Sequence, residues 1–378
     1  MFFWFCLLCL SLICYAACAN QTRLVNETNG ILREKVKFNK YIVFIFAFIL
    51  IFFAGMRSGI GDTGYYMYGF SEYKKYSIMD FFNLNMEKEP GFKFLMIFIS
   101  SFTKNEQVFI FLMAIVTIGL TILAIYKYSE DIGMSLFLFL TTGVYLGMLN
   151  GIRQYIVVAV LFLATNLIIE NKPIKYSLIV ILLSTIHTSA LIMLPIFFFS
   201  RRKVWSFSNF LFIGIFTVFV LTFSNWVQGF VSIFQDTVYG KYSNTLLNET
   251  DVGTNILRIL VMFVPVLLSF LGRKAVDQND IYYRVYSNIL ILNFLIYLLS
   301  SYNWIFARIS MYLNIYTLLF YPYILKRIFD KKSLKIAKVI MILAYSVFFV
   351  FEIRNVDYIS YYLNINRERI GILTRGFY

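Results

Sequence analysis

His187 is the only histidine of the chain, and it lies within a long apolar run. No Asp, Glu, Lys or Arg occurs between Lys175 and Arg201, which flank that run. The imidazole titrates near neutral pH, so His187 is a candidate general base. A histidine in such a run also commonly bonds a backbone carbonyl or a hydroxyl of a neighbouring helix. The residue type alone leaves both roles open.

Arg153 is the only charged residue between positions 132 and 169, and Gln154 follows it. A charged side chain at mid-membrane costs roughly 2.5–3.5 kcal/mol on the insertion scale, and it usually faces a polar cavity. The planar guanidinium donates paired hydrogen bonds and therefore suits a phosphate or pyrophosphate. The preceding Asn150-Gly151 pair equally suits a tight cytoplasmic turn, in which Arg153 would only anchor the membrane face.

Acidic candidates occur in two stretches that are too polar to enter lipid. Residues 57–66 hold three glycines, and Arg57 and Asp62 lie in this stretch. These two residues could form an interfacial ion pair, or they could bind an anionic headgroup and a sugar hydroxyl. Glu89 precedes Pro90, which favours a helix start where a carboxylate complements the helix dipole. Glu89 and Asp62 are also alternative general bases.

A second isolated arginine lies near the end of the chain's apolar part. Arg308 is the only charged residue between Arg284 and Lys326, and Tyr312 follows it four positions later. Arg308 could extend its side chain to the membrane interface, as long basic residues near helix ends do. It could equally contribute to an anion site.

The composition predicts what kind of protein must position these residues. Of 378 residues, 60% are hydrophobic and only 14% are charged, which excludes a soluble enzyme and favours a polytopic α-helical membrane protein. The net charge of +14 reflects basic clusters in short loops, as the positive-inside rule expects, and we do not expect nucleic-acid binding. All four cysteines lie within the first 18 residues, so the rest of the chain has no disulfide or cysteine site. The single histidine excludes a metal site with two histidine ligands, and we expect neither metal nor cofactor.

Long apolar runs predict an all-α fold with about 10–12 transmembrane helices. Residues 1–19 lack a positive n-region and are interpreted as an uncleaved first span. Residues 20–352 are expected to form one polytopic domain with extracytoplasmic loops at 57–90 and 225–253, followed by a polar tail over 353–378. The other expected apolar segments are 41–56, 91–103, 106–126, 132–150, 152–169, 174–199, 206–224, 254–272, 285–303, 305–325 and 336–352.

The topology of residues 91–199 has two possible arrangements. Straight alternation of spans places Arg153 at a cytoplasmic turn and leaves Lys127, Lys172 and Lys175 outside. The reverse arrangement requires one segment within 91–126 and the segment 174–199 to be broken or re-entrant. Broken helices are tolerated where they line a polar cavity.

Taken in order, these motifs resemble the EpsG family of exopolysaccharide proteins, which is grouped with Wzy-type polysaccharide polymerases. The resemblance runs from about residue 41 to 325. The motifs that carry it are Met56-Arg57-Ser58-Gly59-Ile60-Gly61-Asp62-Thr63 with Tyr65 and Tyr66, Glu89-Pro90-Gly91-Phe92, Asn150-Gly151-Ile152-Arg153-Gln154, His187-Thr188-Ser189-Ala190, and Arg308 with Tyr312.

The resemblance implies a polymerase with a GT-C-like architecture in the bacterial cytoplasmic membrane. Its substrates would be undecaprenyl-pyrophosphate-linked oligosaccharides, as donor and as acceptor, joined at the outer face by inverting, metal-independent glycosyl transfer. A flippase and a chain-length regulator are candidate partners in the making of O-antigen, capsule or exopolysaccharide. The expected catalytic residues are His187, Arg153 and Glu89, and the expected substrate-binding residues are Arg57, Asp62, Gln154, Arg308 and Tyr312.

Three other functions remain open at this point. A flippase or transporter for the lipid-linked oligosaccharide would suit the number of apolar segments, although related halves are not visible. Another membrane transferase, such as an O-antigen ligase, could use the same chemistry, whereas an acyltransferase that decorates the glycan would need an early catalytic histidine near an arginine, and the only histidine lies at position 187. A non-catalytic assembly subunit would tolerate loss of His187 and Arg153.

Overall fold

The computed structural model describes residues 2–19, 23–28, 31–36, 40–83, 88–223 and 253–355. The regular structure of these residues is helical, apart from one antiparallel hairpin in which β1 (Arg23–Thr28) pairs with β2 (Ile31–Val36). The prediction of an all-α polytopic membrane protein is confirmed. Except for residue 253 and residues 353–355, the predicted loop 225–253 and tail 353–378 lie outside the described residues.

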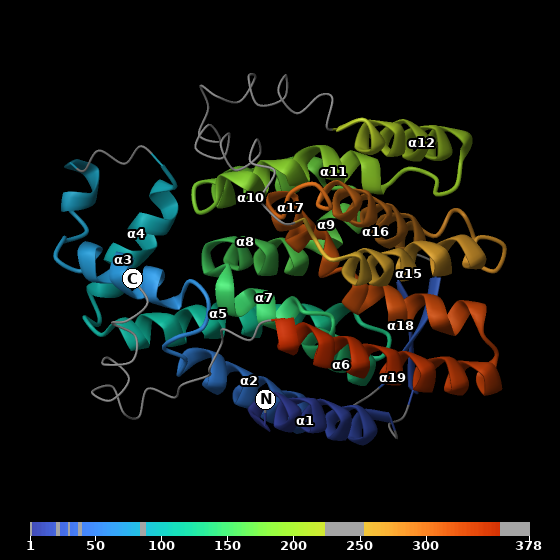
Figure 1. Cartoon of the computed structure of the whole chain (residues 1–378), viewed down its shortest axis with the longest axis horizontal. Coiled ribbons are helices and arrows are strands. Elements are labelled where there is room, and N and C mark those ends of the chain that lie inside the picture. Colours follow the sequence, from blue (N-terminus) through green and yellow to red (C-terminus); the bar gives the residue numbers. More distant parts are fainter. Residues whose placement is uncertain are drawn as a thin grey trace. The chain divides into compact units, whose positions relative to one another are not determined.

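The chain forms two compact units. Unit 1 comprises Met1–Leu194 and Phe329–Tyr378, and unit 2 comprises Pro195–Ile328. The helices of unit 1 are α1 (Phe2–Ala19), α2 (Lys40–Gly55), α3 (Thr63–Tyr73), η1 (Asp80–Asn83), α4 (Pro90–Ser100), α5 (Glu106–Tyr128), α6 (Ile132–Thr141), α7 (Val144–Asn150), α8 (Ile152–Leu163), α9 (Thr165–Ile169), α10 (Pro173–Ser184), η2 (Thr188–Ile192) and α19 (Lys331–Asn355) (Figure 1).

Unit 2 is built around the long helix α16. Its helices are α12 (Phe207–Leu221), α15 (Ile256–Gly272), α16 (Ile281–Leu299), α17 (Ile305–Asn314) and α18 (Thr317–Ile328), and α11 (Met193–Ser200) starts at the boundary between the units. Asp280 caps α16 by accepting the amide N–H of Tyr282, and it also accepts the hydroxyl of Tyr323 on α18 at 2.5 Å. One buried carboxylate therefore joins α16 and α18.

Three described helices are long and apolar enough to cross a membrane: α5, α16 and α19. A fourth such segment is the pair α6–α7, which bends by 50°. The bend follows Thr142, where Gly143 has a positive φ of 82° that suits glycine. Most other apolar runs among the described residues form helices of 10–17 residues, which are shorter than a full span. The described residues therefore contain fewer full-length spans than the about 10–12 that hydropathy alone predicted.

One end of unit 1 gathers the loop after α2 and the starts of α5 and α8. The amide of Gln107 donates to the carbonyls of Gly55 at 2.5 Å and of Arg57 at 3.0 Å. The side-chain oxygen of Asn150 accepts the backbone N–H of Asp62 at 2.9 Å. We call this the Arg57 end of unit 1.

The opposite end of unit 1 gathers the end of α5 and the end of α8. The hydroxyl of Tyr128 donates to the carbonyl of Leu163 at 2.6 Å. Lys127 acts electrostatically on Glu170, which also pairs with Lys172. The start of α19 joins this end, where Lys338 pairs with Asp131, the N-cap of α6.

These contacts support the second of the two expected arrangements. Arg153 starts α8 at the Arg57 end, and the chain then runs to Lys172 at the opposite end. The segment 174–199 is broken at His187 into α10, η2 and α11, as that arrangement requires. Lys127 and Lys172 therefore share an end that the positive-inside rule assigns to the cytoplasm.

Candidate functional site

Glu89 joins Arg153 and His187 through its two carboxylate oxygens. Oε2 accepts from Arg153 Nη1 at 2.5 Å, and Oε1 lies 2.5 Å from His187 Nδ1. All three side chains are mostly buried, and their residues come from three separate segments of unit 1. The structure thus brings together the three residues that the sequence predicted as catalytic.

The backbone of Glu89 adopts an unusual conformation that aims its side chain at this cluster. Its φ of 49° and ψ of 53° are left-handed, a region that costs a non-glycine residue about 1–3 kcal/mol. Pro90 starts α4 directly after it, as expected for proline at a first helical position. The amide N–H of Gly91 donates to the carbonyl of Thr185 at 2.9 Å, which ties the start of α4 to the end of α10.

Close approach of these two backbones requires a glycine at position 91. A β-carbon built on Gly91 would lie 2.2 Å from the hydroxyl oxygen of Thr185 and 3.0 Å from its carbonyl carbon. Any side chain would therefore push α4 away from α10. Glycine at this position lets Glu89 reach His187.

His187 lies at the break between α10 and η2. Its backbone is extended, with φ −150° and ψ 113°, whereas a continued helix would need compact dihedrals. With Nδ1–H donated to Glu89, the lone pair of the imidazole is on Nε2. The carboxylate thus fixes the tautomer and orientation of the ring, as in other carboxylate–histidine pairs.

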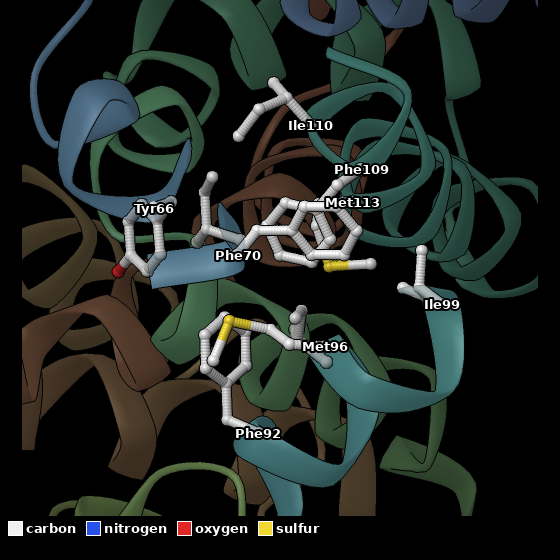
Figure 2. Packing of buried hydrophobic residues seen from close by; sticks show 10 residues of the cluster. Tyr66, Phe70, Phe92, Met96, Ile99, Phe109, Ile110 and Met113 are labelled. Carbon is white, nitrogen blue, oxygen red and sulfur yellow. The ribbon is translucent and has the colours of Figure 1, made fainter. Parts of the chain in front are cut away.

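The guanidinium of Arg153 lies among three aromatic rings. Its central carbon is 5.7–5.8 Å from the ring centres of Tyr65, Tyr66 and Phe92, distances that suit cation–π interactions. Within the described residues, the buried Nε atom of Arg153 makes no hydrogen bond. Tyr66 and Phe92 belong to an apolar cluster (Figure 2). In this cluster Phe70 stacks on Phe109 at 4.7 Å.

Charge and burial act in opposite directions on Glu89. Burial favours the neutral acid, but the hydrogen bond to His187 and the charge of Arg153 outweigh it, so the pKa of Glu89 is lowered. Burial raises the pKa of Tyr66, and nearby Arg153 offsets part of that rise. Glu89 is therefore an anion at neutral pH, and it faces one fixed cation and one histidine.

Comparison with known protein families identifies the chain. The model of the EpsG family matches residues 40–365, most of the chain. The chain belongs to the EpsG family. This family comprises Wzy-type polysaccharide polymerases, so a general role in polysaccharide polymerisation follows from membership. No curated protein and no solved structure matches the chain significantly.

Arg57 of this EpsG-family protein faces the interior of the fold. It is 2% exposed, its Nε donates to the hydroxyl of Thr63 at 3.1 Å, and its Nη1 donates to the carbonyl of Ala54. The side-chain amide of Gln107 donates to the backbone carbonyl of Arg57 at 3.0 Å. In this structure the guanidinium of Arg57 braces the loop that follows α2.

The other predicted binding residues lie in different surroundings. Asp62 is exposed at the start of α3, and its amide is tied to Asn150. Gln154 is buried beside Arg153 on α8. In unit 2, Arg308 lies over the ring of Trp304 at 5.0 Å, and Tyr312 is buried on the same helix, α17.

Three supporting residues escaped prediction as site residues. Gln107 supports the site by donating to the carbonyl of Gly55 at the end of α2. Thr185 supports it by accepting the amide N–H of Gly91. Both contacts form only when the chain folds. Their sequence signals were weak: an amide at the second position of an apolar helix, and a hydroxyl two residues before the histidine. Tyr66 appeared within a family motif, but its proximity to Arg153 depends on packing between α3 and α8.

Proposed function

We propose that this EpsG-family protein is a glycosyltransferase that polymerises oligosaccharides carried on undecaprenyl pyrophosphate. The reaction would take place at the outer face of the bacterial cytoplasmic membrane. The observation that carries this proposal is the bridge that Glu89 makes between Arg153 and His187. A base and a cation held by one carboxylate suit a reaction that removes a proton and releases an anion.

The proposed transfer is a direct displacement at the anomeric carbon of the donor sugar. A hydroxyl oxygen of the acceptor sugar attacks that carbon, and its proton moves to His187 Nε2. The bond between the anomeric carbon and the pyrophosphate oxygen breaks, and its electron pair leaves with the lipid pyrophosphate. The configuration at the anomeric carbon inverts, and no metal ion or cofactor takes part.

His187 is the proposed general base because Glu89 leaves its Nε2 available. As Nε2 takes up the proton, the imidazole becomes a cation next to an anionic carboxylate at 2.5 Å. Glu89 stabilises that cation and keeps the ring in one orientation. General-base catalysis by a positioned side chain contributes typically 10²–10⁴-fold to the rate.

Arg153 is the proposed stabiliser of the departing pyrophosphate. Glu89 engages its Nη1 and Nε is buried, so the exposed part of the guanidinium, 30% of the side chain, is the part proposed to bind the anion. The surrounding rings exclude water from one side, which strengthens the electrostatic interaction. Asp62 and Gln154 of unit 1 are proposed to contact the sugars or the lipid pyrophosphate, whereas Arg57 is proposed to act through the loop that it braces. Arg308 and Tyr312 belong to unit 2 and are proposed separately as substrate-binding residues.

The test is the length distribution of the surface glycan in a strain that lacks this gene. The strain is complemented with wild type, His187→Gln, Arg153→Lys or Glu89→Gln, at equal protein levels. Two exposed positions provide matched controls: Glu72→Gln on α3 and Arg202→Lys after α11. Polymer ladders from wild type and both controls, with single repeat units from the three site variants, would support the proposal.

Other outcomes distinguish the alternatives. If the deletion strain carries no repeat unit on the outer face, the protein is a flippase. If polymer accumulates but is not attached to its final acceptor, it is a ligase. Ladders of normal length from all three site variants would contradict the proposed mechanism.

A further inference from the structure

The outer surface of α4 carries a stripe of exposed phenylalanines. Phe94 and Phe98 on α4, Phe102 just after it and Phe82 on η1 have exposed fractions of 38%, 42%, 76% and 77%. The rings of Phe94 and Phe98 stack at 6.2 Å, and those of Phe98 and Phe102 meet edge to face at 5.2 Å. We call these four residues the phenylalanine stripe.

The other face of α4 is also apolar. Phe92, Met96 and Ile99 are buried against Phe70 and Phe109, as Figure 2 shows. A helix exposed to water carries polar residues on its outer face, whereas a helix that is apolar all round is surrounded by protein or lipid. The outer face of α4 therefore does not have the composition of a water-exposed surface.

α4 is too short to cross a membrane. Its 11 residues extend for about 16 Å, roughly half of the hydrocarbon thickness. Both of its ends also lie at the Arg57 end of unit 1. Glu89 contacts Arg153 before α4, and Gln107 contacts the carbonyl of Arg57 shortly after it. α4 thus runs along that end of unit 1.

Lysines flank the stripe on both sides. Lys88 and Lys104 are exposed, Lys93 is half-buried, and no charged residue lies between Lys93 and Lys104. Aromatic side chains flanked by lysines suit a bilayer surface. There the aromatic rings insert among the acyl chains, and the lysines pair with anionic headgroups. A second copy of this chain fits less well, because a two-fold contact along the stripe would set Lys93 against Lys104.

We propose that the phenylalanine stripe inserts into the membrane interface, with its rings in the acyl region and Lys93 and Lys104 at the level of anionic headgroups. α4 then lies in the plane of the bilayer as a re-entrant element and does not face water. Because Pro90 directly follows Glu89, this placement holds Glu89 at headgroup depth. The proposal concerns membrane placement and does not depend on the proposed reaction.

The test measures the depth of spin labels in a functional background without native cysteines. Cys6, Cys9, Cys14 and Cys18 are replaced by alanine, and single labels are placed at Phe94 or Phe98. The purified protein is reconstituted into vesicles of phosphatidylethanolamine and phosphatidylglycerol. Collision of each label with oxygen reports the acyl region, and collision with a water-soluble nickel chelate reports water.

Labels at Ile115 and Glu72 serve as references, because Ile115 is exposed in the middle of the membrane-length helix α5 and Glu72 is an exposed acidic residue. The labels at positions 94 and 98 are expected to show nickel accessibility well below that at 72 and between the values at 72 and 115, as a shallow position in the acyl region requires. Nickel accessibility equal to that at 72 in both labelled variants would overturn the proposal. Broadening that grows with the protein-to-lipid ratio would overturn it too, in favour of contact between copies.

A second measurement isolates the lysines. The label at Phe98 is compared with and without Lys93→Gln and Lys104→Gln, in vesicles with phosphatidylglycerol and in vesicles of neutral phosphatidylcholine. The substitutions are expected to raise nickel accessibility in the anionic vesicles and to have little effect in the neutral ones. An equal effect in both lipids would contradict headgroup pairing.

Discussion

His187 Nδ1 and Glu89 Oε1 lie 2.5 Å apart, although 98 positions separate the two residues in the chain. The contact depends on a break in one helix and on a left-handed residue before another. Because Arg153 approaches the second carboxylate oxygen, the three groups form one electrostatic unit. Substitutions at these positions should therefore depend on one another.

The Glu89–His187 pair should behave as a single functional unit. Glu89→Gln is expected to lower polymer formation by about 10²-fold, and His187→Gln by about 10²–10⁴-fold. The double variant should be no worse than His187→Gln alone, because an orienting carboxylate has nothing left to orient. Single-round transfer of labelled repeat units in membranes measures this, and additive losses would show that the two residues act separately.

The stability of the protein should fall in acid because of Glu89. Its pKa in the folded protein is lowered from an ordinary value of 4.5, so the anion stabilises the fold at pH values above 4.5. That contribution is lost as the pH falls below 4.5 through the lowered pKa. Thermal unfolding in detergent from about pH 7 to about pH 3 should show a smaller loss for Glu89→Gln than for wild type. Glu72→Gln, which removes a half-exposed carboxylate, should leave the wild-type loss intact.

Gly91→Ala should displace α4 and weaken the site. The added methyl group would collide with Thr185, at a cost of about 1–3 kcal/mol in unfolding free energy. Gly119→Ala on α5 is the matched control, because a β-carbon there meets no atom within 4 Å. The control should be neutral or stabilising by about 0.5–1 kcal/mol, since alanine favours a helix interior over glycine. Equal unfolding temperatures for both variants would contradict the close approach of α4 and α10.

Asn150 should couple the loop after α2 to the helix that carries Arg153. Its side-chain oxygen accepts the amide of Asp62, so Asn150→Asp keeps an acceptor whereas Asn150→Leu leaves that amide unpaired. Asn150→Leu is expected to destabilise the protein by about 1–3 kcal/mol and to shorten the glycan. Glycan length and thermal unfolding of both variants test this prediction. Equal glycan lengths and equal unfolding temperatures for Asn150→Asp and Asn150→Leu would show that the hydrogen bond to Asp62 does not stabilise the fold.

The ion pair between Lys338 and Asp131 should hold α19 against α6 without affecting catalysis. Both side chains are mostly buried, so Lys338→Met leaves a carboxylate with less compensation and should cost about 1–3 kcal/mol. Asp131→Asn combined with Lys338→Met should recover part of that loss. A double-mutant cycle on unfolding temperature measures the coupling, while glycan length at equal protein levels should stay unchanged.

Local sequence features determined the class of the protein. Long hydrophobic runs are recognisable without tertiary contacts. The all-α membrane fold and most helix positions therefore followed from the composition and from the places of these runs in the sequence. The charged residues stood out for the same reason, because a charge in an apolar run is costly wherever it packs. Arg153 and His187 stand out in the sequence for this reason, whereas Glu89 lies in a polar stretch and was indicated by its place before Pro90 and by the family motifs.

Tertiary structure alone decided how these residues meet. Hydropathy does not encode the left-handed backbone of Glu89 or the break at His187, which bring two distant segments within hydrogen-bonding distance. It also could not show that Arg57 faces inward, since that depends on Thr63 and on the carbonyl of Ala54 closing around its guanidinium. Hydropathy reflects the free energy of transferring a side chain out of water, which has no direction. The site depends on hydrogen bonds, which are directional and form only when the helices have packed.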